Sequence, residues 1–382
     1  MVKILTIIGA RPQIIKAAAL SRAIKNKFSS KVKEVIVHTG QHYDDNMSQV
    51  FFDELNIPHP NYNLNAGSGS HGKQTALMIE GIEEILLKEK PTCIVLYGDT
   101  NSTLAGAVAA SKIQVPIIHI EAGLRSFNKS MPEEINRIMC DNVSTLLFSP
   151  TKAGFANLVK EGFKRKNAPP YSFDNPKIYH CGDVMYDNSL FFSNIAESKS
   201  TILKEYDLKN GEFLLVTIHR NNNTDEPKRL NALFRAINKI SVENKMPIIL
   251  PLHPRTAKLL SQNLSSELYS TVKTNELIKI IPPVSFLEMI ALEKNAFLIM
   301  TDSGGVQKEA FFFKKPCIIL RSETEWIELV NSGSAIVADA NEEAIVKAFT
   351  HYKKKKKLKF PDLFGDGTAA EFICSEILKH IN

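Results

Sequence analysis

A glycine turn near residue 304 has the pattern of a phosphate-binding loop. The segment Thr301–Ala310 reads TDSGGVQKEA, and it lies between an apolar run at Ala296–Met300 and a second apolar run that begins at Ala310. This order predicts a strand, a tight turn and a helix. A helix that starts after such a turn has unpaired backbone N–H groups at its N-terminus, and these can hold phosphate oxygens.

Within this turn, Ser303, Gly304 and Gly305 are the expected cradle for a nucleotide diphosphate, because the two glycines have no side chain to keep an anion away. Glu309 is expected in the first helical turn, at a distance that suits sugar hydroxyls. The alternative is an ordinary strand-to-helix turn with a serine cap. The segment alone does not separate the two interpretations.

Chemically active side chains also follow several other apolar, strand-like runs. They occur in six segments: Gly9–Lys16, His38–Asp44, Gly98–Thr103, His119–Ser126, His219–Asn221 and His253–Arg255. Ligands of open parallel sheets bind outside the carboxyl ends of the strands, so chemistry is expected at these segments. A polar loop at Met131–Arg137 follows the fourth of them.

Two of these strands end in a carboxylate, at Asp99 and Glu121. Burying a carboxylate at the end of a strand costs free energy unless the carboxylate is ion-paired or has a chemical function. Each acid alone has a structural explanation, as a loop anchor or, for Asp99 before Thr100 and Ser102, as part of a helix cap. Acids in one half of the chain, together with a phosphate cradle in the other half, favour a catalytic cleft.

Apolar strands alternate with helical stretches, which predicts an α/β protein with parallel sheets covered on both faces. Strands are expected at 3–8, 32–39, 93–97, 116–121, 213–218, 247–251, 298–301 and 317–321. Helices are expected at 13–25, 47–55, 75–88 and 103–112. Lys164–Lys177, which contains Pro169-Pro170, is expected as a surface loop near the domain junction. The amphipathic segment 368–380 is expected as a helix that crosses back to the first domain.

The composition is that of an ordinary globular protein of two-domain size, with 382 residues, 44% hydrophobic and 23% charged. Much of the net charge of +6 can come from Lys353–Lys357, which we interpret as a solvated helix end because no nucleic-acid motif accompanies it. The five scattered cysteines fit a reducing cytosol and indicate neither a zinc site nor a disulfide framework. The N-terminal apolar run is too short for a membrane span and lacks a signal-peptide layout. These features predict a cytoplasmic protein without nucleic-acid or membrane partners.

Seven motifs, in order over essentially the whole length, resemble those of the non-hydrolysing UDP-N-acetylglucosamine 2-epimerases. They are GARPQIIK (9–16), TGQHYD (39–44), GDTNST (98–103), HIEAGLRS (119–126), MPEEINR (131–137), HR (219–220) and TDSGGVQKEA (301–310). The resemblance implies the fold of the B-type glycosyltransferases, with two Rossmann-like domains facing a central cleft. It implies an N-terminal domain of residues 1–176 and 367–382 with the catalytic acids, and a UDP-binding domain of residues 177–366.

The resemblance also implies a reaction, the interconversion of UDP-N-acetylglucosamine and UDP-N-acetylmannosamine. In the family route, the C2 proton is removed while UDP leaves C1, and UDP then adds back to an enzyme-bound 2-acetamidoglucal with C2 protonated on the opposite face. This requires acid–base groups at both faces of C2. By motif, Asp99, Glu121 and Glu133 match the family's acids, and which of them removes the proton stays open.

The departing diphosphate must be stabilised electrostatically. By motif, the residues for this task are the glycine cradle together with Arg11, Lys16, His219 and Arg220. Lys16 and His219 are also candidates for catalysis itself, and Glu309 would hold the ribose hydroxyls. The alternatives are a strand-end ion pair for Arg11, a solvated helix position for Lys16 and a satisfied core histidine for His219.

Five further residues are candidates for regulatory or sugar contacts: Gln41, His42, Arg125, Arg137 and His253. Gln41 and His42 lie in a loop that contributes to a regulatory site for a second substrate molecule in some bacterial members. Here the loop lacks the further glutamine that is usual after His42. Arg125 and Arg137 have a second interpretation, as partners in salt bridges between elements.

One departure from the family pattern concerns the substrate. Relatives commonly carry Thr-Glu-Arg-Pro-Glu where this chain reads TEWIE at 324–328, so Trp326 replaces an arginine that often touches the nucleotide-sugar. Tryptophan packs or stacks but cannot supply that charge. Together with GDVMYD (182–187) and VQKEAFFF (306–313), this variant resembles a branch that epimerises UDP-2,3-diacetamido-2,3-dideoxyglucuronic acid at C2. Arg125 or Arg137 would then pair with the uronate carboxylate.

Three other classes of protein share part of the pattern. A glycosyltransferase of the same fold would have the cradle, but it needs an acceptor and leaves MPEEINR unexplained. A hydrolysing relative would release UDP and free sugar, and a non-catalytic binding protein would not need the three acids. The epimerase resemblance implies a UDP-sugar substrate, no metal or redox cofactor, a homodimer, and a product that enters surface polysaccharide synthesis.

Overall fold

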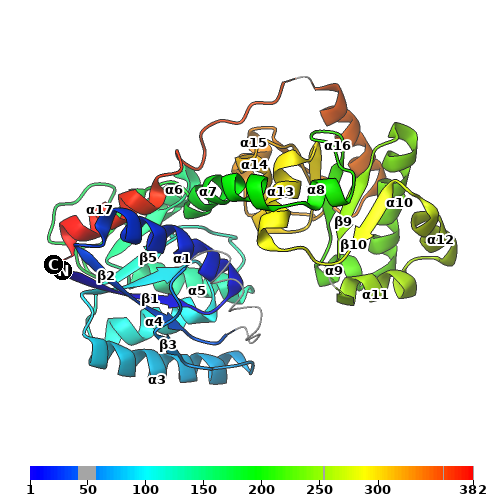
Figure 1. Cartoon of the computed structure of the whole chain (residues 1–382). Helices are drawn as coiled ribbons and strands as arrows, with labels where there is room; N and C mark the ends of the chain where they lie inside the picture. The colour runs from blue at the N-terminus through cyan, green and yellow to red at the C-terminus, as the bar shows by residue number, and fades with distance from the viewer. Residues whose placement is uncertain (42–56, 253, 356, 382) are drawn as a thin grey trace. The chain divides into compact units, whose positions relative to one another are not determined.

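The structure is a computed structural model that describes residues 1–41, 57–252, 254–355 and 357–381 (Figure 1). The chain divides into two compact units. The first consists of Met1–Asn188 with Asp362–Asn382, and the second of Ser189–Pro361. Each unit is built on one parallel sheet with helices packed against it.

The first unit contains a seven-stranded parallel sheet in the order β3-β2-β1-β4-β5-β6-β7. Its strands are β1 (Val2–Ile8), β2 (Val32–His38), β3 (Tyr62–Asn63), β4 (Cys93–Tyr97), β5 (Ile117–Ile120), β6 (Leu146–Ser149) and β7 (Lys177–His180). The central strands are continuous apolar runs because both faces are covered, and every residue of β4 is buried. The strand order reverses between β1 and β4, which is the switch point where Rossmann-type sheets bind ligands.

Helices cover both faces of this sheet. They are α1 (Arg11–Ala23) with a π-helical turn (Ile24–Phe28), α3 (His71–Glu89), α4 (Asn101–Lys112), α5 (Pro132–Asn142), α6 (Lys152–Lys160), the start of α7 (Val184–Lys199) and α17 (Ala369–His380). Figure 1 shows α1 and α17 on one face, with α3 and α4 on the other. Leu5 and Ile7 of β1 share a buried core with Met78 and Ile82 of α3, so the apolar face of each helix is matched to the sheet.

The chain leaves the first unit for the second and later returns to it. The outgoing and returning segments contact one another inside the first unit. Gly182 and Gly365 both have positive φ, and a Cβ on Gly182 would lie 2.8 Å from the carbonyl oxygen of Phe364. The carboxylate of Asp187 accepts hydrogen bonds from the first two N–H groups of α17, at 3.2 and 2.8 Å. The GDVMYD motif therefore ties the outgoing chain to the returning one.

The second unit contains a six-stranded parallel sheet in the order β10-β9-β8-β11-β12-β13. Its strands are β8 (Leu214–Thr217), β9 (Ile248–Pro251), β10 (Ile278–Ile281), β11 (Leu298–Thr301), β12 (Cys317–Ile319) and β13 (Ala335–Val337). Its helices are α8 (Ile202–Glu205), α9 (Asn221–Thr224), α10 (Pro227–Asn244), α11 (Pro254–Asn263), α12 (Ser266–Thr274), α13 (Phe286–Asn295), α14 (Gly304–Phe312), α15 (Ile327–Asn331) and α16 (Glu342–Lys354). The order reverses between β8 and β11, which gives this unit a second switch point.

The predicted α/β class with two Rossmann-like sheets is confirmed, and α17 returns to the first unit as expected. The helix expected at 47–55 lies outside the described residues. The passage to the second unit follows Asn188 instead of residue 176, because Lys177 begins β7 and β7 pairs with β6 in the first sheet. The return falls at 361/362 instead of 366/367. No helix in the described part of the chain is long and apolar enough to cross a membrane.

Candidate active site

Lys16 and Glu121 form an ion pair at the switch point of the first sheet. Lys16 is carried by α1, and Glu121 directly follows β5. An added Cβ on Gly98 would lie 3.1 Å from both Nζ of Lys16 and Oε2 of Glu121, so the pair rests against this glycine. The two side chains are only 13% and 11% exposed, so Lys16 is not the solvated helix residue of the alternative interpretation.

Glu121 has a φ of +75°, a conformation that costs free energy in a residue with a side chain. Its N–H and that of Ala122 both lie 3.0 Å from the carbonyl oxygen of Phe148 in β6, which fixes the turn after β5. Such backbone strain is typical of functional positions. The fold thus holds Glu121 in a strained backbone conformation at the carboxyl end of β5.

Asp99 follows β4 and pairs with Arg137 of α5, while its side chain keeps 34% exposure. The pKa of Asp99 is raised, chiefly because burial penalises the charged form. Arg137 and Lys16 offset part of this rise, whereas Glu121 and Glu133 add to it. The charges of Glu121 and Glu133 therefore both act on Asp99 within the first unit, and Glu133 is exposed on α5.

Two residues of MPEEINR without an expected role hold this arrangement together. Glu134 is buried, accepts from the N–H of Ser126 at 2.9 Å, and has Oε2 2.7 Å from Nη2 of Arg137. Nδ2 of Asn136 donates to the carbonyl oxygen of Asp99 at 2.9 Å. In the sequence, the i, i+3 spacing of Glu134 and Arg137 already indicated that the two side chains would pair on a helix.

Gln13 of GARPQ joins the loops that follow β1 and β4. Its Oε1 accepts from the backbone N–H groups of Gly9 and Ala10 at 2.9 and 3.2 Å. Its Nε2 donates to the carbonyl oxygen of Tyr97 at 2.9 Å and to Oγ1 of Thr103 at 3.0 Å. The buried amide of Gln13 thus forms hydrogen bonds with groups of both loops. These bonds fix the backbone that carries Lys16 and Asp99.

Gln41, expected as a regulatory or sugar contact, meets the first turn of α4. Its Oε1 accepts from the N–H of Ser102 at 3.0 Å and from Oγ of Ser102 at 2.7 Å. This interaction positions the start of α4. His42 and His253, named with Gln41, lie outside the described residues.

Arg125 belongs to a buried ion network and has no surface for a sugar. Its side chain is 1% exposed, and Nη2 lies 2.7 Å from Oδ2 of Asp141 and 2.6 Å from Oε2 of Glu161. Oδ1 of Asp141 lies 2.7 Å from Nδ1 of His119. For Arg125 the structure shows the salt-bridge interpretation, and the expected sugar contact is corrected. Arg137 also forms ion pairs, but these involve the acids of the site.

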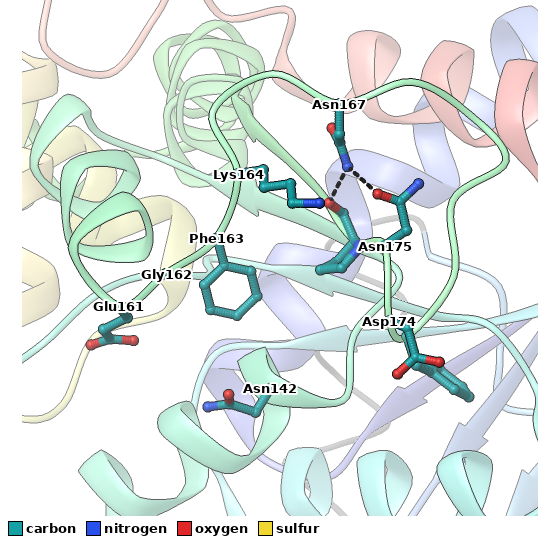
Figure 2. A pocket seen from close by; sticks show the side chains of 10 residues that line it. Asn142, Glu161, Gly162, Phe163, Lys164, Asn167, Asp174 and Asn175 are labelled. Carbon is teal, nitrogen blue, oxygen red and sulfur yellow. Dashed lines mark hydrogen bonds between the residues drawn. The ribbon is translucent and has the colours of Figure 1, made fainter.

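Glu161 also lines a pocket of about 230 Å³ in the first unit (Figure 2). The loop that follows α6 forms much of its wall, where Nδ2 of Asn167 donates to Oδ1 of Asn175 at 3.2 Å. Lys164 and Asp174 contribute charges of opposite sign to its lining. None of the predicted catalytic or substrate-binding residues lines this pocket.

His219 follows β8 at the switch point of the second sheet and is held by Asp302, which follows β11. Nδ1 of His219 lies 2.9 Å from Oδ1 of Asp302, and the histidine side chain is 53% exposed. It is therefore not the core histidine of the alternative interpretation. Arg220 is also exposed, and its Nε donates to the carbonyl oxygen of Asp302 at 3.1 Å.

The glycine turn starts α14 as expected, with Ser303 as its cap. Oγ of Ser303 accepts from the N–H of Val306 at 3.5 Å. An added Cβ on Gly304 would collide with Oε1 of Glu325, whereas one on Gly305 would meet only Oγ of Ser303, at 3.8 Å. The serine cap and an anion cradle are compatible, because a cap satisfies only one of the free N–H groups of a helix.

Glu309 is the sixth residue of α14 and lies in its second turn instead of the first, because the helix begins at Gly304. Arg11 is the first residue of α1 and is exposed. Within the described ranges, no group of three or more histidine, cysteine or acidic side chains could hold a metal ion.

Trp326 is buried and packs against a lysine of α14. Nζ of Lys308 lies 4.4 Å from the centre of the Trp326 ring, a cation–π distance. The neighbouring Thr324 donates from Oγ1 to Oε1 of Gln307 at 2.6 Å. The segment that differs from the family pattern is therefore packed along α14 beside the glycine turn.

The two Rossmann-type sheets, with acids at one switch point and a histidine and glycine turn at the other, define a two-domain α/β enzyme of the nucleotide-binding class. The comparisons with known proteins agree. The family model described as UDP-N-acetylglucosamine 2-epimerase matches residues 24–378. The chain therefore belongs to the UDP-N-acetylglucosamine 2-epimerase family and is an isomerase.

Individual relatives support the same family assignment. A Pseudomonas aeruginosa protein named UDP-2,3-diacetamido-2,3-dideoxy-D-glucuronate 2-epimerase is 48% identical over 377 residues, with 99% of each chain covered. The structure of Methanocaldococcus jannaschii UDP-GlcNAc 2-epimerase in complex with UDP-GlcNAc and UDP has a TM-score of 0.83 at 42% identity, with 99% of each chain covered. Phytolacca americana UGT2 has a TM-score of 0.59 at 11% identity, covering 100% of this chain and 95% of that one, which shows likeness of fold alone.

Proposed function

We propose that this epimerase inverts C2 of a UDP-linked 2-acetamido sugar by eliminating UDP and adding it back. The observation that carries the proposal is the group of acids at the first switch point, where Asp99 lies among Glu121, Glu133 and the ammonium of Lys16. A reaction that removes a proton from one face of C2 and returns one to the other needs more than one acid–base group.

The elimination breaks the C2–H and C1–O bonds of the sugar. A carboxylate takes the C2 proton, the C–H electron pair becomes the C1=C2 bond of a 2-acetamidoglucal, and the C1–O bond breaks with its electrons on UDP. In the reverse addition, a UDP oxygen attacks C1 and C2 takes a proton on the opposite face. The net change is inversion at C2, with no oxidant or reductant consumed.

The two strand-end acids have different surroundings. The carboxylate of Glu121 pairs with the Lys16 ammonium, and Glu121 is a candidate to accept the C2 proton. The raised pKa of Asp99 suits this residue to carry one. Groups whose environments differ in this way support a division of roles, and kinetics of single variants must assign them.

The second unit would hold the nucleotide. The free N–H groups at the start of α14 and the exposed imidazole of His219 suit the diphosphate, whose charge grows as the C1–O bond breaks. Glu309 on the same helix would accept hydrogen bonds from the ribose hydroxyls. Arg220, Lys16 and Arg11 would add charge-assisted hydrogen bonds.

For the sugar, we favour UDP-2,3-diacetamido-2,3-dideoxyglucuronate. The relative of that name is 48% identical over 99% of both chains, and Trp326 with Lys308 departs from the family pattern beside the glycine turn. Because Arg125 is buried in its own ion network, the uronate carboxylate needs a different cation. UDP-N-acetylglucosamine is the second candidate, supported by the 42% identical M. jannaschii structure.

Three further features stay proposals. We propose a homodimer, a cytoplasmic location in line with the scattered free cysteines, and a product that enters surface polysaccharide synthesis. Sedimentation of the purified protein tests the first of these.

The test of function is an assay with one UDP-sugar and no acceptor. Purified enzyme is incubated with each candidate substrate, and the products are separated by ion-exchange chromatography and identified by their coupling constants. We expect a mixture of C2 epimers, both still linked to UDP. Free sugar would indicate a hydrolase, and an unchanged substrate would contradict the proposal.

A further inference from the structure

His119 is a histidine in the interior of the first unit that no step above uses. It lies on β5, and its side chain is 0% exposed. Its two ring nitrogens have different partners. Nδ1 lies 2.7 Å from Oδ1 of Asp141 on α5, and Nε2 lies 2.9 Å from the carbonyl oxygen of Gly98, the residue directly before Asp99.

The partners of His119 determine its protonation state. A carbonyl oxygen can only accept a hydrogen bond, so Nε2 must carry a proton to bond to Gly98. Asp141 is also an acceptor, because its Oδ2 receives the N–H of Gly123 at 3.1 Å and Nη2 of Arg125 at 2.7 Å. The guanidinium of Arg125 favours the ionised carboxylate. Nδ1 must therefore carry a proton as well, and the ring of His119 is an imidazolium ion.

Opposite charges surround this buried imidazolium, as a buried cation requires. The carboxylate of Asp141 lies between His119 and Arg125, and Glu161 supplies a second negative charge, with Oε2 2.6 Å from Nη2 of Arg125. Burial by itself would lower the pKa of His119, but Cys140 and Asp141 outweigh this effect, and the pKa lies well above its usual range. Burial would likewise raise the pKa of Asp141, but the bonds from His119 and Arg125 hold it below its usual range.

The bond from His119 to Gly98 reaches the turn that carries Asp99. Gly98 has a φ of +62°, and its N–H donates to the carbonyl oxygen of Ile120 at 3.0 Å. Strand β5 therefore holds both backbone polar groups of this glycine. Because the peptide unit is planar, fixing the carbonyl oxygen of Gly98 also fixes the direction in which the chain enters Asp99.

We infer that His119 is a positioning residue for Asp99: as an imidazolium anchored by Asp141, it donates a hydrogen bond to the carbonyl oxygen of Gly98 and fixes the turn from which Asp99 reaches the substrate. The inference rests on the proposed function, in which Asp99 exchanges a proton with the sugar. A hydrogen bond from a cation is roughly twice as strong as one between neutral groups. A reacting group that is misplaced by about 1 Å can cost about 100-fold in rate.

The other neighbours of His119 leave this assignment intact. Its register partners in the sheet are Leu96 of β4 and Leu147 of β6, which are both buried and apolar. Besides Asp141, the titratable group of α5 that acts on His119 is Cys140, whose Sγ lies 4.0 Å from Oγ of Ser144.

The alternative is that His119 only balances the buried charge of Asp141. Two neutral substitutions separate these roles. In His119→Gln, the amide nitrogen takes the place of Nε2 and can still donate to Gly98. In His119→Asn, the amide nitrogen takes the place of Nδ1 and can donate only to Asp141. Both variants lack the cation, so each is the matched control for the other.

The experiment has a kinetic part and a spectroscopic part, both on the full chain. Steady-state kinetics with each of the two UDP-sugars give kcat and KM for the wild type and both variants. Circular dichroism and thermal melts show that each variant is folded. NMR of the wild type labelled with 15N-histidine gives the protonation state of each ring at pH 8.5, and the signal that His119→Gln lacks is that of His119.

We expect both ring nitrogens of His119 to be protonated at pH 8.5, where an ordinary histidine with a pKa of about 6.5 is neutral. Both variants should melt below the wild type, because both leave Asp141 without its cation. His119→Asn should lose up to about 100-fold in kcat with little change in KM, since the proposed nucleotide contacts lie elsewhere. His119→Gln should have a kcat about tenfold or more above that of His119→Asn.

Two results would overturn the inference. One is a neutral His119 ring in the wild type at pH 8.5. The other is a pair of folded variants with equal kcat, which would leave His119 with the charge-balancing role alone.

An Asp99→Asn variant separates this failure from failure of the proposed function. If Asp99→Asn turns over the UDP-sugars like the wild type, the proposed role of Asp99 is wrong. If Asp99→Asn loses turnover while the two His119 variants match one another, only the role of His119 is wrong.

Discussion

Oδ1 of Asp302 lies 2.9 Å from Nδ1 of His219, and the same carboxylate accepts hydrogen bonds from the backbone N–H groups of His219 and Arg220 and from Nδ2 of Asn223, each at about 3.1 Å. Burial alone would raise the pKa of Asp302, but these bonds outweigh it and hold the pKa below its usual range. An ionised Asp302 places the imidazole proton on Nδ1. Nε2 of the exposed ring then carries no proton and is free to accept a hydrogen bond.

Asp302→Asn should therefore impair catalysis more than UDP binding. Asparagine keeps the shape but turns one acceptor into a donor that faces other donors, so the ring of His219 loses its fixed tautomer and orientation. We expect kcat to fall about 100-fold or more, with a changed pH profile. Asp225→Asn, in an exposed pair with Arg255, is the control. A wild-type kcat and pH profile in Asp302→Asn would show that His219 does not depend on this carboxylate.

Arg137→Met should shift the pH dependence of turnover. Arg137 lowers the pKa of Asp99 against the effect of burial, so its removal raises that pKa further. The limb of the kcat/KM profile that Asp99 controls should move to higher pH, whether Asp99 acts as the acid or as the base. The measurement is kcat/KM between pH 5 and 10, with Arg235→Met, from an exposed pair with Glu342, as the control. A limb that stays in place or moves to lower pH would remove Asp99 from the rate-controlling ionisations.

Trp326 and Lys308 should behave as a coupled pair. Trp326→Arg places a second buried cation beside Lys308, so we expect the melting temperature to fall by several degrees. Adding Lys308→Glu to this variant supplies an opposite charge and should recover stability. A double-mutant cycle of thermal melts measures the coupling, expected at about 1–3 kcal/mol. Strictly additive effects would show that the side chains at positions 308 and 326 do not interact.

Arg125→Met should destabilise the fold and leave substrate choice unchanged. Its removal leaves Asp141 buried with less compensation, a type of change that costs about 3–5 kcal/mol. Chemical denaturation gives the stability, and the ratio of kcat/KM for the two UDP-sugars gives the choice. Native stability combined with selective loss of turnover on the uronate would restore Arg125 as a sugar contact.

Much of the fold could be predicted from the pattern of apolar residues in the sequence. Strands β4 and β11 were expected at their observed bounds because strands covered on both faces are unbroken apolar runs. β7 was missed for the opposite reason: its residues KIYH form an edge strand with only one buried position, and they follow a proline-rich loop. The domain boundary was placed too early as a result.

The sequence motifs predicted part of the candidate site. Asp99, Glu121 and Lys16 could be named because they follow apolar strands, where parallel sheets carry their chemistry. Gln13 acts through contacts with Tyr97 and Thr103, which residue type and spacing do not reveal. For Glu134, spacing indicated only the pair with Arg137 and not the hydrogen bond from the N–H of Ser126. These contacts required the structure.

Proton NMR of the enzyme with each UDP-sugar in D2O shows directly whether the proton at C2 is exchanged. We expect deuterium to appear at C2 as the C2 epimer forms, with UDP still attached, and UDP-2,3-diacetamido-2,3-dideoxyglucuronate to be the better substrate. Exchange with UDP-N-acetylglucosamine alone would keep the reaction and reverse the choice of sugar. UDP binding without exchange at C2 in either sugar would contradict the claim that this chain is a C2 epimerase of these substrates.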